Sequence, residues 1–165
     1  MSEEVGARLA KLEKRLAALE DQAAIYQLLA SYGPAADSGS IPEAVQLWAD
    51  DGIYDLHNQM MKSHADIAEE LAGKWHQGLI AQGSAHIVSM PHVVVDGDEA
   101  VATCHSRLYR REDEGGYRVL SCSANRWELK RINGKWRVAR RVSRRLDGSD
   151  ESHEVLAAGV RAVKA

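Results

Sequence analysis

The order of the two hydrophobic periodicities constrains the fold of this chain more than any other feature. Helix-like patterns and one short strand, in GIYDL, fill the first half, and alternating strand-like runs follow Gly83 almost without interruption. Turn signals separate the runs at residues 96–98, at 114–116 and at Asn133-Gly134, the strongest hairpin signal in the chain. Consecutive hairpins form a meander with one face on a core. The sequence therefore predicts an α+β fold, a cone in which a curved antiparallel sheet wraps around the N-terminal helices.

No linker, repeat or low-complexity block divides the 165 residues, and this length suits a single domain. We expect three parts: an N-terminal helical arm over residues 1–20, the α+β cone over 21–147, and a C-terminal tail over 148–165. The tail reads as a loop and a terminal helix.

Five apolar residues recur in the arm at spacings of four and three: Val5, Leu9, Leu12, Leu16 and Leu19. We call them the N-terminal stripe. It spans about two heptads, and an isolated helix of this length is marginal in water, so the stripe must be buried against something. Packing on its own domain and contact with a neighbouring subunit both remain open. Together with one apolar face of the sheet, the stripe favours a homo-oligomer, either a dimer or a trimer.

A second amphipathic pattern runs from Asp21 to a natural stop near Gly39. Pro34 lies inside it and predicts a kink or break just before Asp37. Asp37 would then stand at the end of this helical region.

The net charge of −3 excludes a global field for nucleic acid, and the basic run over residues 137–145 has no aromatic stacking platform beside it. We interpret that run as an outer strand face or a subunit interface, with the option that one arginine turns inward to hold a carboxylate or phosphate. No segment has the roughly 20 apolar residues of a membrane helix, and the N-terminus lacks a signal-peptide pattern. The two cysteines, Cys104 and Cys122, imply no disulfide framework. We expect a cytoplasmic protein with no membrane or nucleic-acid partner.

The residues that carry chemistry are Tyr32, Asp37 and His86. A histidine titrates near neutral pH, and a carboxylate on one ring nitrogen fixes its tautomer and stabilises the imidazolium. Tyr32, about one helical turn before Asp37, would donate to a developing oxyanion or to a leaving hydroxyl. If the three face one cavity, they suit β-elimination or enolisation of a small apolar substrate. Each residue alone also fits a structural role, so the prediction rests on the combination.

Six further residues are expected to line that cavity around a planar or polycyclic ligand: Trp48, Tyr54, His105, Tyr109, Asn125 and Arg145. The last of these comes from the resemblance described next. His64 and His76 fit solvated helix positions, and His57 fits the cavity rim. No histidine stands in the context that metal sites favour, so we expect neither a metal nor another cofactor.

Four stretches carry a family resemblance: AAIYQLLASY…AADSGS, AVQLWADDGIYD, the His86 strand with VVVDGDEA, and WELKRINGKWRVARR. Over residues 20 to 147 the chain resembles the SnoaL-like branch of the nuclear transport factor two-like superfamily. The resemblance implies a cystatin-like cone and, for many members, cofactor-independent lyase or isomerase activity on steroid-like or polyketide-like molecules. Other members only bind small molecules, and that alternative stays open.

Within that branch the chain is most similar to bile acid 7α-dehydratases, and less so to scytalone dehydratases. In the bile acid 7α-dehydratases, the catalytic Tyr, the Asp five residues later and the His on the following strand match Tyr32, Asp37 and His86. An arginine near the end of the last strand corresponds to Arg145. The chain departs from the dehydratase pattern in HSRLYRR, which has no carboxylate.

Overall fold

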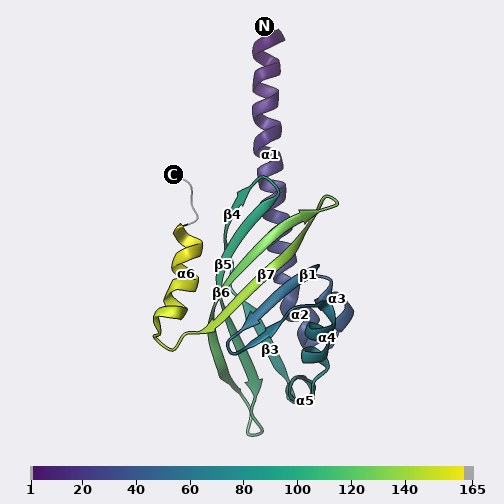
Figure 1. Ribbon diagram of the computed structural model, residues 1–165, viewed down its shortest axis with the longest axis vertical. Coiled ribbons are helices and arrows are strands. Elements are labelled where there is room, and N and C mark those ends of the chain that lie inside the picture. Colours follow the sequence, from purple (N-terminus) through teal and green to yellow (C-terminus); the bar gives the residue numbers. More distant parts are fainter. Residues whose placement is uncertain (1, 162–165) are drawn as a thin grey trace.

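The computed structural model describes residues 2–161, in which helices precede a long meander (Figure 1). The helices are α1 (Ser2–Ala30), α2 (Tyr32–Asp37), α3 (Ile41–Val45), α4 (His64–Ala72), α5 (Lys74–Gln82) and α6 (Asp150–Arg161). The strands are β1 (Trp48–Leu56), β2 (Gln59–Met61), β3 (Ser84–Val88), β4 (His92–Asp96), β5 (Glu99–Arg111), β6 (Tyr117–Ile132) and β7 (Lys135–Arg145). The prediction of an α+β fold with a curved sheet around N-terminal helices is confirmed.

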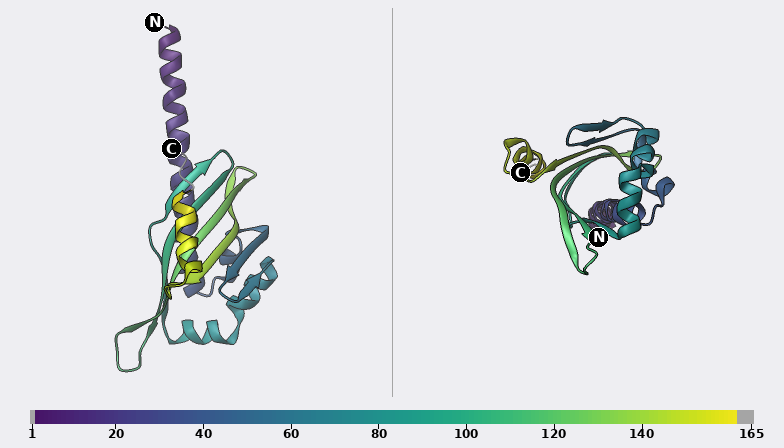
Figure 2. Two further views of the ribbon diagram at one scale, coloured as in Figure 1. Left: turned by 60° about the vertical axis from the view of Figure 1, so that its left-hand side comes forward. Right: turned by 90° about the horizontal axis from the view of Figure 1, so that it is seen from below.

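The seven strands form one sheet in the order β2-β1-β7-β6-β5-β3, with β4 also paired to β5. Strands β3 and β4 share β5, because β3 pairs with its residues 106–110 and β4 with its residues 99–103. The β5–β6–β7 meander is antiparallel as predicted, whereas β1 joins β7 in parallel, which makes the sheet mixed. The concave face surrounds the helices in the view from below (Figure 2).

The break predicted from Pro34 is present, but it lies at Ser31 and not just before Asp37. Helix α1 ends at Ala30, Ser31 forms a turn, and α2 runs from Tyr32 to Asp37. Proline has no N–H to donate to the carbonyl four residues earlier, so the helical ladder is interrupted at Ala30. Tyr32, the first residue of α2, is buried.

Helix α1 is continuous, but only its second half belongs to the cone. Asp21 accepts two hydrogen bonds from Arg131 at 2.8 Å and one from Trp136 Nε1 at 3.2 Å, which fixes the helix to β6 and β7. Every residue over 4–20 is exposed, and this half extends beyond the sheet (Figure 1). The side chains of the N-terminal stripe are 52% to 64% exposed, so the interpretation that the stripe packs on its own domain is wrong.

The core fills the space between the concave face and the helices. Ile25 and Leu29 of α1 pack against Trp48, Trp127 and Val138 of the sheet, all nearly fully buried. No helix in residues 2–161 combines the length and the apolar character that a membrane crossing would need.

Helix α6 covers the opposite, outer face of the sheet (Figure 2). Its Val155 packs with Ala124 and Val142, and Gly159 lies so close to Thr103 that a Cβ there would stand 1.5 Å from the threonine hydroxyl. The predicted tail is therefore a short loop and a packed helix.

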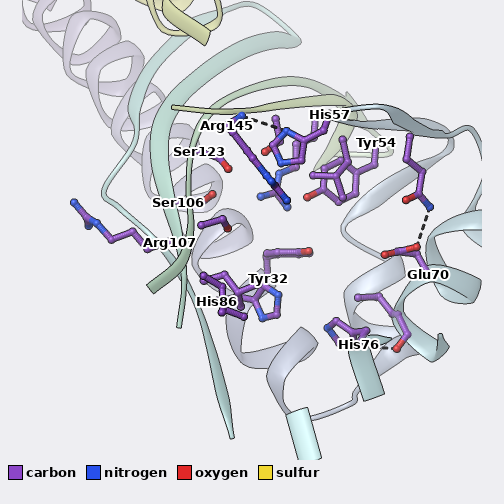
Figure 3. A pocket seen from close by; sticks show the side chains of 18 of the residues that line it. Tyr32, Tyr54, His57, Glu70, His76, His86, Ser106, Arg107, Ser123 and Arg145 are labelled. Carbon is purple, nitrogen blue, oxygen red and sulfur yellow. Dashed lines mark hydrogen bonds between the residues drawn. The ribbon is translucent and has the colours of Figure 1, made fainter. Parts of the chain in front are cut away.

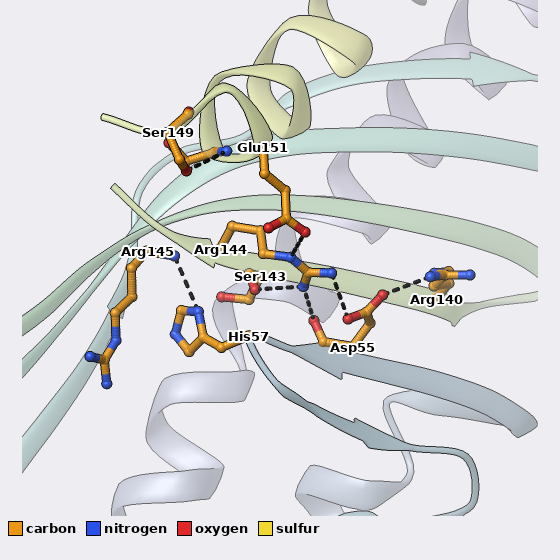
Figure 4. A network of polar contacts seen from close by, with 9 residues as sticks. Asp55, His57, Arg140, Ser143, Arg144, Arg145, Ser149 and Glu151 are labelled. Atoms are coloured by element: carbon orange, nitrogen blue, oxygen red, sulfur yellow. Dashed lines mark hydrogen bonds and ion pairs between the residues drawn. The ribbon is translucent and has the colours of Figure 1, made fainter. Parts of the chain in front are cut away.

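The basic run at the end of the sheet divides by strand alternation. On the outer face, Arg140 and Arg144 bind the buried carboxylate of Asp55 at 2.7 and 2.8 Å, and Arg144 also binds Glu151 of α6 at 2.5 Å (Figure 4). These ion pairs join β1, β7 and α6. Arg141 points the other way, toward the helices.

Candidate functional site

A cavity of about 470 Å³ opens on the concave side of the sheet, between the strands and α2, α4 and α5 (Figure 3). Its wall mixes apolar side chains such as Leu56, Ile67 and Leu108 with histidines, serines and arginines. This size and this mixture are typical of small-molecule sites.

His86 lines this cavity, and Asp37, which is not among the lining residues, binds His86. The Nδ1 atom of His86 lies 2.7 Å from Oδ1 of Asp37, and the backbone N–H of His86 donates to Oδ2 at 2.6 Å. Ser84 Oγ donates to Oδ1 at 2.8 Å. The side chains are 22% exposed for Asp37 and 16% for His86. The C-terminal end of α2 is thereby bound to β3 through one carboxylate.

Gly33 permits this contact between α2 and β3. A Cβ at position 33 would stand 2.1 Å from the backbone oxygen of His86, which is closer than any side chain could approach. Only glycine lets the helix lie against the strand here, so Gly33 sets the distance over which Asp37 reaches His86.

The hydrogen bonds favour the ionised form of Asp37 and set the tautomer of His86. Burial acts to raise the pKa of Asp37, but the bonds from the His86 ring, the His86 backbone and Ser84 outweigh it, and the pKa lies below its ordinary value. A carboxylate only accepts hydrogen bonds, so Nδ1 of His86 carries a proton. In the neutral ring, Nε2 then keeps its lone pair, the arrangement that a general base requires.

Tyr32 and Tyr54 complete the polar wall as expected, and both line the cavity. The Tyr32 ring stands edge-on to the His86 ring with centroids 6.2 Å apart, and Tyr54 stacks on Trp48 at 5.7 Å. Burial raises the pKa of Tyr54 far above its ordinary value, although the charge of Arg141 opposes this. Tyr54 is therefore a neutral phenol at physiological pH.

His76 is a cavity residue that the sequence reading placed in solvent. It is only 4% exposed, its Nδ1 lies 2.9 Å from the carbonyl oxygen of Leu71, and its ring centroid lies 5.5 Å from that of His86. Because a carbonyl accepts, Nδ1 donates, and Nε2 has no partner among residues 2–161. Burial and, secondly, His86 lower the pKa of His76, so its ring is neutral. Gly73 ends α4 and starts α5, which shifts the phase and leaves Trp75 64% exposed instead.

Four predicted lining residues lie elsewhere. Trp48 belongs to the buried core, and Tyr109, half-buried beside a β-bulge, is not part of the cavity wall. The pairing of β5 with β6 places Cys104 opposite Asn125 and His105 opposite Ala124. Paired residues share a face, so His105 and Asn125 cannot both point inward as predicted. His105 is on the exposed outer face.

Asn125 is fully buried behind the cavity wall and holds two residues that line it. Its Nδ2 donates to Ser106 Oγ at 2.8 Å, and its Oδ1 accepts from Arg141 Nε at 3.0 Å. Asn125 is thus a positioning residue for the wall.

Arg141 is the functional candidate that the sequence reading did not select. It lines the cavity, is 2% exposed, and its guanidinium carbon lies 4.5, 4.5 and 4.1 Å from the ring centroids of Tyr32, Tyr54 and Trp127. Its Nη1 has no hydrogen-bond partner, and no carboxylate of residues 2–161 forms an ion pair with it. Arg145, the arginine selected from the resemblance, also lines the cavity, and its backbone N–H donates to Nδ1 of His57 at the rim (Figure 3).

A buried cation without a carboxylate partner is costly, and the positive charge of Arg141 acts on a ligand in the cavity that it lines. Strand alternation could have identified it, since Arg141 is an even number of residues from both Ser143 and Arg145, which line the same cavity. Within the described residues, no group of three His, Cys, Asp or Glu side chains is arranged to hold a metal ion.

Comparisons with known proteins agree with this architecture. The profile of the SnoaL-like domain matches residues 17–142. The crystal structure of an NTF2-like protein with a cystatin-like fold from Novosphingobium aromaticivorans is 40% identical, with a TM-score of 0.87 over 90% of this chain and 96% of that one.

Two more distant structures share the fold. Rv3472 from Mycobacterium tuberculosis is 19% identical, with a TM-score of 0.70 over 87% of this chain and 96% of that one. Aln2 from a Streptomyces species is 16% identical, with a TM-score of 0.70 over 78% of this chain and 92% of that one. No curated protein matches the chain.

Proposed function

The chain belongs to the SnoaL-like domain family, and from this premise we propose that it is a cytoplasmic, cofactor-independent lyase or isomerase acting on a hydrophobic carbonyl compound. The observation that carries the proposal is the 2.7 Å contact of Asp37 with His86, which lines the cavity. The proposed substrates are steroid-like or polyketide-like ring systems, for which a cavity of about 470 Å³ is suitable.

His86 is the proposed base. Its Nε2 lone pair takes a proton from the carbon next to a carbonyl group, and the electron pair left on that carbon moves into an enolate. Asp37 keeps Nδ1 protonated and stabilises the imidazolium that forms, as the aspartate of a hydrolase triad does. Proton transfer of this kind contributes about 10² to 10⁴-fold in rate.

Tyr32 and Arg141 are the proposed partners of the developing negative charge. The Tyr32 hydroxyl donates a hydrogen bond to the oxyanion, and the buried guanidinium of Arg141 adds a positive potential at little cost in reorganisation. In a dehydration, the enolate reforms the carbonyl as the β-hydroxyl leaves, and the proton on His86 completes the water molecule. In an isomerisation, His86 returns the proton to another carbon of the conjugated system.

The proposed kinship with bile acid 7α-dehydratases and scytalone dehydratases rests on Tyr32, Asp37 and His86. The chain differs from the first group on β5, where the residues that line the cavity are Ser106, Arg107, Leu108 and Arg110, and none of them is a carboxylate. A second acid is therefore missing from that wall, and Arg141 stands nearby instead. This difference favours a substrate in which the oxyanion, rather than the leaving group, needs the larger stabilisation.

A binding protein without turnover is the second candidate, and one observation favours it. Asp37 also accepts hydrogen bonds from the backbone of His86 and from Ser84, so it has a structural role that needs no catalysis. In that case the same polar groups only orient a bound molecule.

A ligand screen with an exchange readout separates the two. Steroids, bile acid coenzyme A esters and aromatic polyketides are tested by thermal shift, and each hit is incubated in D₂O and analysed by mass spectrometry. We expect wild type to exchange a proton, lose water or shift a double bond, and His86→Ala to lose this activity by at least 100-fold. His105→Ala, on the outer face of the same sheet, is the matched control. A ligand that binds wild type and emerges unexchanged would support the binding protein instead.

A further inference from the structure

The N-terminal stripe has no partner within the described chain. Residues 4–20 are all exposed, and the first residue of α1 held by the cone is Asp21. Seventeen residues of isolated helix are marginal in water, even without the cost of exposing five apolar side chains. A second surface must cover this segment if the helix is to persist.

The stripe has the phase of a coiled coil. Leu9 and Leu16 occupy a positions, while Val5, Leu12 and Leu19 occupy d positions, with alternating spacings of four and three. The segment extends for about 25 Å at 1.5 Å per residue. Lysine and alanine fill the outward b, c and f positions from residue 7 to residue 18, as on the solvent side of a coiled coil.

Charges beside the stripe specify the partner. Arg8 and Arg15 fall at g positions, and Glu13 and Glu20 fall at e positions. In a parallel pair, each g residue faces the e residue five positions later on the other helix, which brings Arg8 to Glu13 and Arg15 to Glu20. In an antiparallel pair, g faces g and e faces e, so the same side chains would oppose like charges.

We infer that residues 4–20 form a parallel, in-register coiled coil with the same segment of a second copy of this chain. None of Arg8, Glu13, Arg15 and Glu20 forms an ion pair with another described residue, so all four are available to the partner. Both signs of charge border the stripe, which disfavours an anionic membrane surface as its occupant. This inference is independent of the proposed catalysis, because the stripe lies outside the cone.

Cysteine cross-linking of the full chain tests the arrangement. Val5→Cys in a Cys122→Ser background places one thiol at a d position, and the other cysteine, Cys104, is buried. A parallel coil brings the two position-5 thiols together, whereas an antiparallel one separates them by about 20 Å, at 1.5 Å per residue. We expect mild oxidation at micromolar protein to yield a cross-linked pair, and Cys122→Ser alone to yield none.

Two charge variants in that background test the pairing. The first variant is Arg8→Glu/Arg15→Glu, and the second is Glu13→Arg/Glu20→Arg. Each places like charges opposite one another in a homodimer, so we expect at least tenfold less cross-linking from either one. Mixing the two should restore it. The control is Lys11→Glu/Lys14→Glu, which changes the net charge as much as the first variant does, but at outward positions. It should cross-link as well as the parent protein, which carries only Val5→Cys and Cys122→Ser.

Absence of the cross-link in the parent would overturn the inference, as would cross-linking that the charge variants do not reduce. Helix content over residues 4–20 that rises only with anionic phosphatidylglycerol vesicles would overturn it in favour of a membrane surface. Sedimentation velocity on the parent gives the number of chains in the assembly.

Discussion

Replacing Asp37 by Asn should reverse the tautomer of His86 and weaken the fold by a calculable amount. An amide has one accepting and one donating end, whereas the carboxylate accepts at Oδ1 from Ser84 and the His86 ring, and at Oδ2 from the His86 backbone. The backbone N–H cannot change its role, so the amide oxygen must take the Oδ2 place. The amide N–H₂ then faces Nδ1 of His86, which must give up its proton and become an acceptor.

The magnitude follows from the three hydrogen bonds. Charge-assisted bonds are about twice as strong as neutral ones, so each bond loses about 1 kcal/mol, and the sum is about 2–3 kcal/mol in the free energy of unfolding. Since the pKa of Asp37 is lowered in the folded protein, its contribution is present above the unfolded value near 3.9. It is lost as the pH falls through the folded pKa. The difference between wild type and Asp37→Asn should therefore shrink in acid.

Two measurements test this reasoning without a known substrate. Urea denaturation at pH 7 gives the free energy of unfolding, with Asp113→Asn in an exposed turn as the matched control. Nitrogen-15 NMR of labelled histidine rings reports the tautomer, and His86→Gln identifies the signal. The reasoning is refuted if His86 keeps its proton on Nδ1 in Asp37→Asn, or if Asp37→Asn and Asp113→Asn have the same free energy of unfolding. Where a substrate is found, kcat should fall by about 10³ to 10⁴-fold, because Nε2 would hold the proton.

Three other changes have expected outcomes. Gly33→Ala should lower the free energy of unfolding, measured in urea, by more than about 2 kcal/mol, because its Cβ would meet the backbone oxygen of His86. The control is Gly78→Ala, in a helix with open space around it, which should be neutral or stabilise by about 0.5–1 kcal/mol. Burial lowers the pKa of His76 in the folded protein, so as the pH falls the unfolded chain, whose histidine has a pKa near 6.5, binds its proton first and the protein loses stability. His76→Asn should therefore reduce the loss of unfolding free energy between pH 7.5 and 5.5. An unchanged slope of unfolding free energy against pH would contradict this. Arg141→Met should reduce the rate of proton exchange into a bound ligand by about 10²-fold or more. It should change the free energy of unfolding by less than about 2 kcal/mol. Exchange at the wild-type rate would exclude the electrostatic role of Arg141.

The fold was largely predictable because its signals are local. The turn at Asn133-Gly134, the alternation of β6 and β7, and the break caused by Pro34 each depend on a few neighbouring residues. The parallel pairing of β1 with β7 was not predictable in this way, because it joins segments more than 80 residues apart. Nor does the apolar spacing of the N-terminal stripe say whether its partner is the same chain, and only the exposure of residues 4–20 answers that.

The positions of candidate site residues were predictable where they followed from spacing along one helix or from a family pattern. They were not predictable where they depended on which face of a strand or helix a residue occupies. Alternation along a strand decides which of two neighbouring residues faces the cavity. Because Asn125 pairs with Cys104 and not with His105, Asn125 and His105 lie on opposite faces of the sheet. The interruption at Gly73 likewise changed the phase of the following helix, so His76, predicted to be solvated, is buried, and Trp75 is exposed. Arg141 was hidden among other arginines of equal chemistry, and its burial appears only when three aromatic rings from different elements surround it.

The short helix α2 makes the proposed base and acid one unit. Tyr32 begins it and Asp37 ends it, while Gly33 holds the helix against the strand that carries His86. Because Oδ2 of Asp37 binds the backbone of His86 and Oδ1 binds its ring, the ring orientation is fixed relative to Tyr32 even in the absence of a ligand. A purely structural clamp would need only the backbone bond. The additional bond to Nδ1 sets a tautomer and leaves Nε2 as a basic nitrogen, as the proposed proton transfer requires.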